Sequence, residues 1–286
     1  MKSLVLAVAA AAFTCSGYAT LKKPAYDTLI AHRGESIDAP ENTMPAFRTA
    51  VERGFGFECD IYLSADKKLF TFHDGNLKRT TGGKHTERCV EASWENTVSK
   101  INVGGWGKWK GSKFDPTTPA LLEDVLKLAR DGRYIYVEIK GGDPSWVPYI
   151  KEVFAKQSNA TPKNVLFISF STAVCAELKR LMPEYRVYWL TGSRKRADKK
   201  TGEAARPYKP EEIIEILKRL GVDGVDMGFK ADDVTAAFIK TIKDAGFEFH
   251  TWTIDNLERA KLAFSRGAQT VTTNRAKGLL EEYNAK

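Results

Sequence analysis

The sequence predicts a TIM barrel, a closed sheet of eight parallel strands surrounded by helices. Two observations support this fold. Short apolar runs alternate with amphipathic stretches along almost the whole chain, and there are eight of each in 286 residues. A doubly wound open sheet is the alternative, but it has fewer strands and a glycine-rich first turn. The first turn here contains only Gly34, so a dinucleotide fingerprint is absent.

Each element follows from a local pattern. Strands are expected at the apolar runs 28–33, 55–60, 134–140, 164–169, 185–190, 223–227, 248–254 and 268–273. Helices are expected near 43–53, 119–130, 144–157, 172–182, 209–220, 231–245, 256–266 and 275–283. The stretch EEIIEILKRLG shows the helical pattern clearly, because its apolar residues recur at helical spacing and a glycine follows the end.

One insertion interrupts this alternation, at about residues 61–118 between the second strand and the second helix. It opens with IYLSADKKLFTFHD, which predicts a hairpin, and continues as an irregular stretch rich in Gly, Trp and Lys. Because the loops after barrel strands form the catalytic face, we expect the insertion to cover the site.

The N-terminus has the layout of a secretory signal peptide over residues 1–19, with Gly17-Tyr18-Ala19 as the cleavage site. Acylation of Cys15 in a lipoprotein leader is the alternative, but Phe13 and Thr14 suit that processing poorly. We therefore expect an exported protein whose barrel domain spans residues 20–286.

The basic composition, +8 overall, suits anionic partners such as phosphate esters, acidic polymers or a negative membrane surface. No nucleic-acid recognition motif is present. The basic run 193–209 could contact an anionic surface or polymer, although a solvated loop is the simpler expectation. Cys59, Cys89 and Cys175 allow at most one disulfide and match no zinc spacing, and the oligomeric state stays open.

Acidic residues gather where predicted strands end. Glu58 and Asp60 end the second strand on one face, Cys59 points to the other face, and Glu138 ends the third strand. Three carboxylates at one barrel mouth repel one another unless a positive charge lies between them. Oxygen ligands suit one hard divalent cation, Mg²⁺ or Ca²⁺. The alternative is a structural ion network of these acids with Arg33 and Lys140.

Two histidines and two cations fall at the same end of the strands. His32 and Arg33 end the first strand, Lys140 ends the third, and His73 closes the hairpin. Histidines transfer protons near neutral pH, and arginine and lysine bind phosphate oxygens. Together with a cation, this set predicts displacement at phosphorus.

These residues form an ordered series of motifs: His-Arg-Gly, Pro-Glu-Asn-Thr, Glu-x-Asp, His-Asp and Glu-Ile-Lys. The series resembles the glycerophosphodiester phosphodiesterases, and the resemblance continues through LFISFSTAVCAELKRLMPEYRVYWL and TWTIDNLERAKLAFSRGAQTVTTN. It implies a TIM-barrel hydrolase that releases glycerol 3-phosphate and an alcohol. In such enzymes the neighbouring glycerol hydroxyl attacks phosphorus, and water opens the resulting cyclic phosphate.

The resemblance also implies roles for individual residues: metal ligands Glu58, Asp60 and Glu138, proton acceptor His32, proton donor His73, phosphate contacts Arg33 and Lys140, supporting residues Glu41 and Asn42, and Trp252 against the glycerol. Asn274 departs from the pattern, because the family usually has an aspartate there. Two alternative functions remain. One is a phospholipase D-type activity on lysophospholipid or sphingomyelin, although the enzymes of that type lack such an insertion. The other is a non-catalytic phosphoester-binding barrel.

Other conspicuous residues have simpler explanations. His250 lies deeper than Trp252 on the seventh strand, which favours an interior structural histidine, and His85 is expected to face solvent. Trp94, Trp106 and Trp109 could form an aromatic wall for a ligand or the insertion's own small core.

Overall fold

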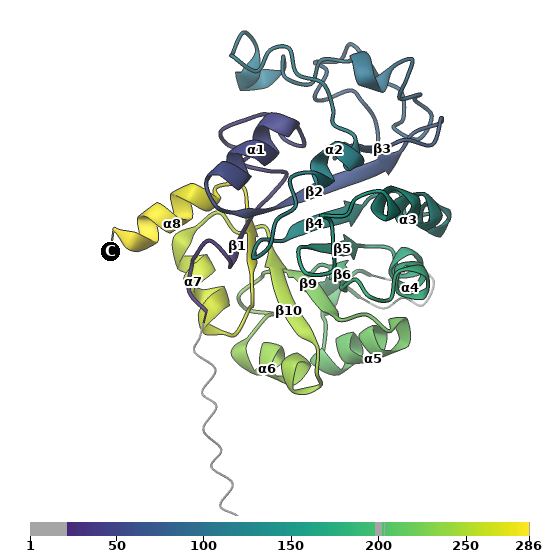
Figure 1. The fold of residues 1–286 in the computed structure, drawn as a ribbon. Helices are drawn as coiled ribbons and strands as arrows, with labels where there is room; N and C mark the ends of the chain where they lie inside the picture. The colour runs from purple at the N-terminus through teal and green to yellow at the C-terminus, as the bar shows by residue number, and fades with distance from the viewer. Residues whose placement is uncertain (1–21, 198–201, 203, 286) are drawn as a thin grey trace, which may run out of the picture.

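Eight parallel strands close into a barrel in the computed structural model, which describes residues 22–197, 202 and 204–285. They are β1 (Leu29–Ala31), β2 (Gly56–Leu63), β4 (Ile135–Ile139), β5 (Val165–Ser169), β6 (Val187–Thr191), β9 (Gly224–Gly228), β10 (Glu248–Trp252) and β11 (Val271–Thr273). Each pairs with the next around the ring, and the parallel pairing of β1 with β2 completes the closure. The predicted TIM barrel is confirmed (Figure 1).

Helices surround the barrel, as expected from the alternating pattern. They are α1 (Met44–Glu52), α2 (Leu122–Leu126), α3 (Val147–Ala155), α4 (Thr172–Leu181), α5 (Pro210–Leu220), α6 (Ala236–Asp244), α7 (Leu257–Ser265) and α8 (Ala276–Asn284). Helices α2 and α6 differ most from their predicted ranges. Helix α6 begins late because Thr235 caps it, accepting from the Phe238 N–H at 3.1 Å. Helix α2 ends early in tighter turns, where Leu128 and Ala129 bond carbonyls three residues back.

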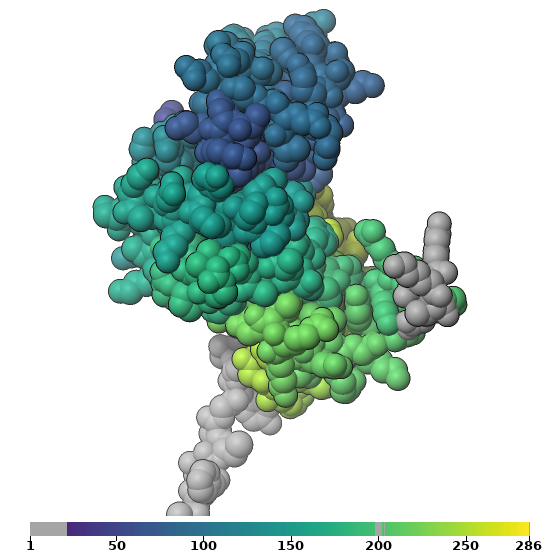
Figure 2. Space-filling view, turned by 90° about the vertical axis from the view of Figure 1, so that its right-hand side faces the viewer, coloured from purple at the N-terminus to yellow at the C-terminus, as the bar shows by residue number. Residues whose placement is uncertain are grey.

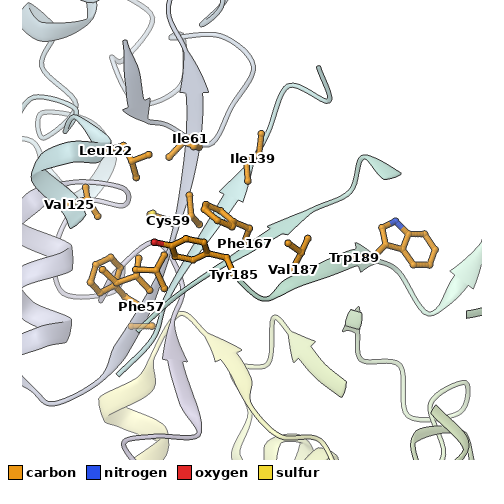
Figure 3. Close-up of a cluster of buried hydrophobic side chains, with 14 of the residues drawn as sticks. Phe57, Cys59, Ile61, Leu122, Val125, Ile139, Phe167, Tyr185, Val187 and Trp189 are labelled. Atoms are coloured by element: carbon orange, nitrogen blue, oxygen red, sulfur yellow. The ribbon is translucent and has the colours of Figure 1, made fainter. Parts of the chain in front are cut away.

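The main core lies between the outer face of the barrel and the helices. Figure 3 shows Phe57, Cys59 and Ile61 of β2 on the side that faces Leu122 and Val125 of α2. All five are essentially buried. Since alternate residues of a strand point to opposite faces, Glu58 and Asp60 point into the barrel. Each fully buried Leu, Ile or Phe side chain contributes roughly 1.5 to 3 kcal/mol through removal from water.

The barrel interior holds a second, smaller apolar cluster, which contains Ile30, Tyr136, Leu166, Ile168, Tyr188 and Leu190. His250 lies at the lower end of this cluster, toward the N-terminal ends of the strands. It is buried and stacked on Tyr188 with ring centroids 4.3 Å apart. Its Nδ1 lies 2.7 Å from Thr270 Oγ1, and its Nε2 lies 3.2 Å from Glu248 Oε2. His250 is therefore an interior histidine with both nitrogens paired, as expected.

The insertion forms a lobe next to β2 and α2 at the top of Figure 1, and it occupies the upper part of Figure 2. Strand β2 runs on to Leu63, three residues past its predicted end, because it pairs antiparallel with β3 (Leu69–Thr71) in the expected hairpin. The irregular part of the insertion therefore begins beyond this hairpin.

The tryptophans of the insertion mainly pack within it. Trp109 is buried edge-on against Phe114, with centroids 5.6 Å apart, and Trp94 lies 6.2 Å from Phe70. Trp106 is half-buried beneath the Arg79 guanidinium, 5.0 Å from its ring. Two of the three thus belong to the lobe's own core.

Several sequence expectations concern the chain's ends and loops. The signal-peptide segment 1–19, with Cys15, lies outside the described residues, as do Lys199 and Lys200 of the basic run. The flanks of that run form a short antiparallel pair, β7 (Arg194–Lys195) with β8 (Arg206–Pro207). Cys59, Cys89 and Cys175 are buried free thiols. Within the described ranges, no helix combines the length and apolar character needed to cross a bilayer.

Candidate active site

Three buried carboxylates meet at the C-terminal ends of two neighbouring strands. Glu58 and Asp60 extend from β2 and Glu138 from β4, and the parallel register places Asp60 opposite Glu138. One oxygen from each residue lies within 4.8 Å of the others. The strand pairing thus brings together residues that are 80 positions apart in the sequence, from 58 to 138.

Two of these carboxylates have a buried oxygen without a hydrogen bond. Glu58 Oε1 and Asp60 Oδ1 are buried and accept no hydrogen bond from the described part of the chain. Burial, together with the charges of Asp60 and Glu138, raises the pKa of Glu58 well above its usual range. Burial and Asp60 raise the pKa of Glu138 to about 8. Convergent oxygens without donors are what a hard divalent cation requires, so Mg²⁺ or Ca²⁺ fits this donor set.

Asn42 holds Asp60 in place from the loop between β1 and α1. Its Nδ2 donates to Asp60 Oδ2 at 2.7 Å, and its Oδ1 accepts from the Asp60 backbone N–H at 3.0 Å. Asn42 adopts a left-handed backbone with φ 56°, which asparagine tolerates better than most residues. This two-way contact fixes the carboxylate's rotation and leaves Oδ1 directed at the other acids.

His32 follows directly after β1 and lines the cavity beside the carboxylates. Its Nδ1 lies 2.7 Å from Asn274 Oδ1, and its Nε2 lies 3.9 Å from Glu58 Oε2. Since an amide oxygen only accepts, Nδ1 carries the hydrogen and Nε2 keeps a lone pair. Burial and the Arg33 charge lower the pKa of His32 to about 4, so the ring is neutral at physiological pH.

Asn274 is itself fixed by Asp255, a residue that the sequence reasoning missed. Asn274 Nδ2 donates to Asp255 Oδ2 at 2.7 Å, and the Asn274 backbone N–H donates to Asp255 Oδ1 at 2.8 Å. Asp255 therefore fixes the orientation of the Asn274 amide, and this amide in turn fixes the orientation of the His32 ring. Only the fold brings the three together, because they follow three different strands.

His73 reaches the same cavity from the β2–β3 hairpin. Its Nδ1 lies 2.8 Å from Asp74 Oδ1. Asp74 belongs to the His-Asp motif noted in the sequence, but the sequence reasoning gave it no role. The two histidines thus have different partners, an amide for His32 and a carboxylate for His73.

Arg33 and Lys140 place two positive charges against the acids. The Arg33 backbone N–H donates to Glu58 Oε2 at 2.9 Å, and its Nε lies 3.5 Å from Asp60 Oδ2. Lys140 Nζ lies 2.9 Å from Glu138 Oε1 and 3.3 Å from Asp60 Oδ1. Both side chains also line the cavity, where an anionic group could reach them.

The turn that presents His32 and Arg33 depends on Gly34. Arg33 has φ 57° and Gly34 has φ 77°, so the chain reverses sharply after β1 and the strand ends at Ala31, before the predicted residue 33. A Cβ on Gly34 would lie 2.6 Å from the Ala46 carbonyl carbon of α1. Only glycine permits this approach.

The cavity has a volume of about 170 Å³ and one aromatic wall. The Trp252 indole donates to the Asp226 carbonyl at 3.0 Å, and Phe170 meets the Trp252 ring edge-on at 5.5 Å. Phe170 is half-exposed at the rim. Asp226 lines the cavity with a buried carboxyl that has no hydrogen-bond partner among the described residues. Sequence reasoning identified neither Phe170 nor Asp226, because nothing in the local sequence distinguishes them and only the folded barrel brings them to the cavity.

The fold and the site define a TIM-barrel protein with an acidic, histidine-flanked centre at the C-terminal ends of its strands. This is the barrel end where catalytic residues gather. The chain belongs to the glycerophosphoryl diester phosphodiesterase family, whose model matches residues 32–277.

Similar proteins agree with this assignment. A glycerophosphodiester phosphodiesterase of Caldanaerobacter subterraneus is 32% identical over 163 residues, which are 56% of this chain and 64% of that protein. Human glycerophosphodiester phosphodiesterase 1 is 33% identical over 129 residues, which are 45% of this chain and 38% of that protein. The chain therefore matches less than two thirds of either relative's length.

Solved structures share the fold. An Oleispira antarctica phosphodiesterase, determined with the product sn-glycerol-3-phosphate, has a TM-score of 0.73 and 22% identity, covering 90% of this chain and 96% of that one. A Parabacteroides distasonis glycerophosphodiester phosphodiesterase has a TM-score of 0.69 and 21% identity, covering 91% and 98%.

Proposed function

We propose that this protein hydrolyses glycerophosphodiesters to sn-glycerol 3-phosphate and an alcohol. The observation that carries this proposal is the convergence of Glu58, Asp60 and Glu138 at a cavity that two histidines also line. Family membership and the product-bound Oleispira structure support the same substrate class.

One divalent cation, Mg²⁺ or Ca²⁺, would be held by Glu58, Asp60 and Glu138. When bound, it would neutralise the acids and withdraw charge from the phosphoryl oxygens. Arg33 and Lys140 would bind the same phosphate, and Glu41 and Asn42 would keep Arg33 and Asp60 in position through the contacts at 2.8 and 2.7 Å. The Trp252 and Phe170 rings would pack against the glycerol carbons.

The two histidines would transfer protons in opposite directions. His32 Nε2 takes the proton of the adjacent glycerol hydroxyl, whose oxygen attacks phosphorus. The bond from phosphorus to the leaving alcohol breaks, and that alcohol takes a proton from His73, whose ring the Asp74 carboxylate orients through the contact at 2.8 Å. A water then opens the cyclic phosphate with His73 as acceptor and His32 as donor, which restores both rings.

The test is an assay of purified protein against a panel of glycerophosphodiesters, with coupled detection of glycerol 3-phosphate. Chelator should abolish turnover, and Mg²⁺ or Ca²⁺ should restore it. A diester without the adjacent hydroxyl should be a poor substrate; equal turnover would favour direct attack by water. Turnover of lysophospholipid or sphingomyelin alone would support the phospholipase D-type alternative instead.

We also propose export after removal of residues 1–19, which rests on the leader-like N-terminus. Expression of the full chain in a bacterial host, followed by mass measurement of the protein from the periplasmic fraction, tests it. A mature mass beginning at residue 20 is expected, and an intact cytoplasmic chain would contradict the proposal.

A further inference from the structure

Two side chains at the mouth, His73 and Arg33, each contact a carboxylate of their own. His73 contacts Asp74, with Nδ1 2.8 Å from Oδ1, and Arg33 NH1 donates to Glu41 Oε1 at 2.8 Å. Asp74 comes from the insertion, whereas Glu41 comes from the loop between β1 and α1. Without a further contact, the two pairs would be independent.

Arg79 joins these two carboxylates. Its Nε and NH2 donate to Asp74 at 2.8 and 2.9 Å, and its NH1 and NH2 donate to Glu41 at 2.9 and 2.7 Å. The guanidinium thus makes a paired contact with each acid, and it also lies 5.0 Å from the Trp106 ring. An unbroken chain of contacts runs from His73 through Asp74, Arg79 and Glu41 to Arg33.

We propose that Arg79 is a positioning residue that sets His73 and Arg33 together, so that proton donor and phosphate contact are ordered by one side chain of the insertion. This inference rests on the proposed function. The insertion thereby has a specific role, because it contributes His73 to the cavity and also supplies the group that couples two elements of the site.

The contact geometry requires arginine. A planar guanidinium offers two parallel N–H pairs on adjacent edges, which matches two carboxylates at once. A lysine ammonium is a compact point charge and can satisfy one carboxylate well but not both in this arrangement. The charges balance as well, since two arginines and two acids alternate along the chain of contacts. Loss of Arg79 leaves Glu41 and Asp74 facing each other without the cation between them.

The variants Arg79→Lys and Arg79→Gln test the inference, with Arg88→Gln as the matched control. Arg88 belongs to the same insertion, but its side chain is 69% exposed and pairs only with Glu91, at 3.1 Å, among the contacts known for it. We expect kcat/KM to fall roughly 10- to 100-fold in both Arg79 variants, as for other residues that orient catalytic groups. The Arg88 variant should match the wild type.

The two arms can be separated kinetically. Asp74→Asn should lower kcat with little change in KM, Glu41→Gln should mainly raise KM, and Arg79→Gln should do both. In a double-mutant cycle, Arg79→Gln should have a much smaller effect in the Asp74→Asn background than in the wild type. Guanidinium added to Arg79→Ala should restore part of kcat, whereas sodium at equal concentration should not.

The outcomes distinguish this inference from the proposed function. An inactive wild-type protein on every glycerophosphodiester contradicts the proposed function. An active wild type with Arg79 variants within twofold of it, or with fully additive effects in the cycle, overturns the role of Arg79. If Arg79→Gln loses its fold by circular dichroism, the lysine variant and the guanidinium rescue still decide the question.

Discussion

The barrel contains two groups of histidine and carboxylate side chains, and they differ in how fully their buried polar atoms are paired. At the lower end, His250 has partners on both nitrogens, and Glu248 also accepts from Tyr188 at 2.8 Å. At the mouth, Glu58 Oε1 and Asp60 Oδ1 accept no hydrogen bond from the described residues, although both side chains are buried and Lys140 Nζ lies 3.3 Å from Asp60 Oδ1.

The difference supports the proposed roles of the two groups, one structural and the other functional. Buried polar atoms are almost always paired in folded proteins, so a satisfied cluster needs no ligand to explain it. An unsatisfied one carries a free-energy penalty that a bound partner can offset. The mouth cluster is thus built for a ligand, whereas the lower cluster holds strands β6 and β10 in place.

The largest expected effect is on catalysis at the mouth. His32→Ala and His73→Ala should each lower kcat by at least about a hundredfold, because each removes one proton transfer. The thermal midpoint should change little. His85→Ala is the control, since that ring is half-exposed and lies 3.8 Å from Glu87 of the insertion. Full activity in either of the first two variants would remove that histidine from the mechanism.

The lower cluster should respond in the opposite way. His250→Leu should lower the free energy of unfolding by about 2 to 4 kcal/mol, because it leaves Thr270 and Glu248 short of a partner inside the barrel. Urea unfolding measures this, and activity below the transition should stay within about twofold. A stable but inactive variant would show that the two clusters are not separate.

Cation binding should stabilise the protein only through the carboxylates at the mouth. At a Ca²⁺ or Mg²⁺ concentration about 100 times the Kd, the free energy of unfolding should rise by about 2.7 kcal/mol. Glu58→Gln should abolish the increase, and Glu248→Gln should retain it. Chelator titrations followed by thermal unfolding make the measurement, and an equal rise in both variants would place the cation elsewhere.

The smallest expected effect concerns Asp226 and pH. Burial raises the pKa of Asp226 from 3.8 to about 7, so the folded protein holds this proton more tightly than the unfolded chain. Its contribution is therefore most favourable below pH 4 and is lost as the pH rises toward 7. The ceiling is about 4 kcal/mol, and contact with the cavity should reduce it to about 1 to 2 kcal/mol.

Asp226→Asn lacks this titration. Relative to the wild type, the variant should gain stability between pH 4 and pH 7, as measured by urea unfolding at several pH values. A constant difference between the two proteins across that range would show that Asp226 is paired in solution.

Much of the fold and the centre of the site could be predicted from the sequence. Eight alternating strands and helices are the pattern of a TIM barrel, and residues 58, 60 and 138 fall on neighbouring strands whose C-terminal ends meet in that fold. Helix ends were less accurate, since a local cap such as Thr235 decides them. Asp255, Asp226 and Phe170 could not be found in this way, because their partners are set by three-dimensional packing and leave no spacing in the chain.

Strand β2 has a consequence for how this protein can vary. It pairs with β1, β4 and β3, and its alternation sends Glu58 and Asp60 inward and Cys59 outward. A slip of one residue in its pairing would exchange the acidic centre for a thiol and drive two carboxylates into the apolar layer. Natural variation should therefore leave the length of this strand untouched while tolerating changes in the parts of the lobe away from His73, Asp74 and Arg79, so substrate preference can drift while the reaction centre stays fixed.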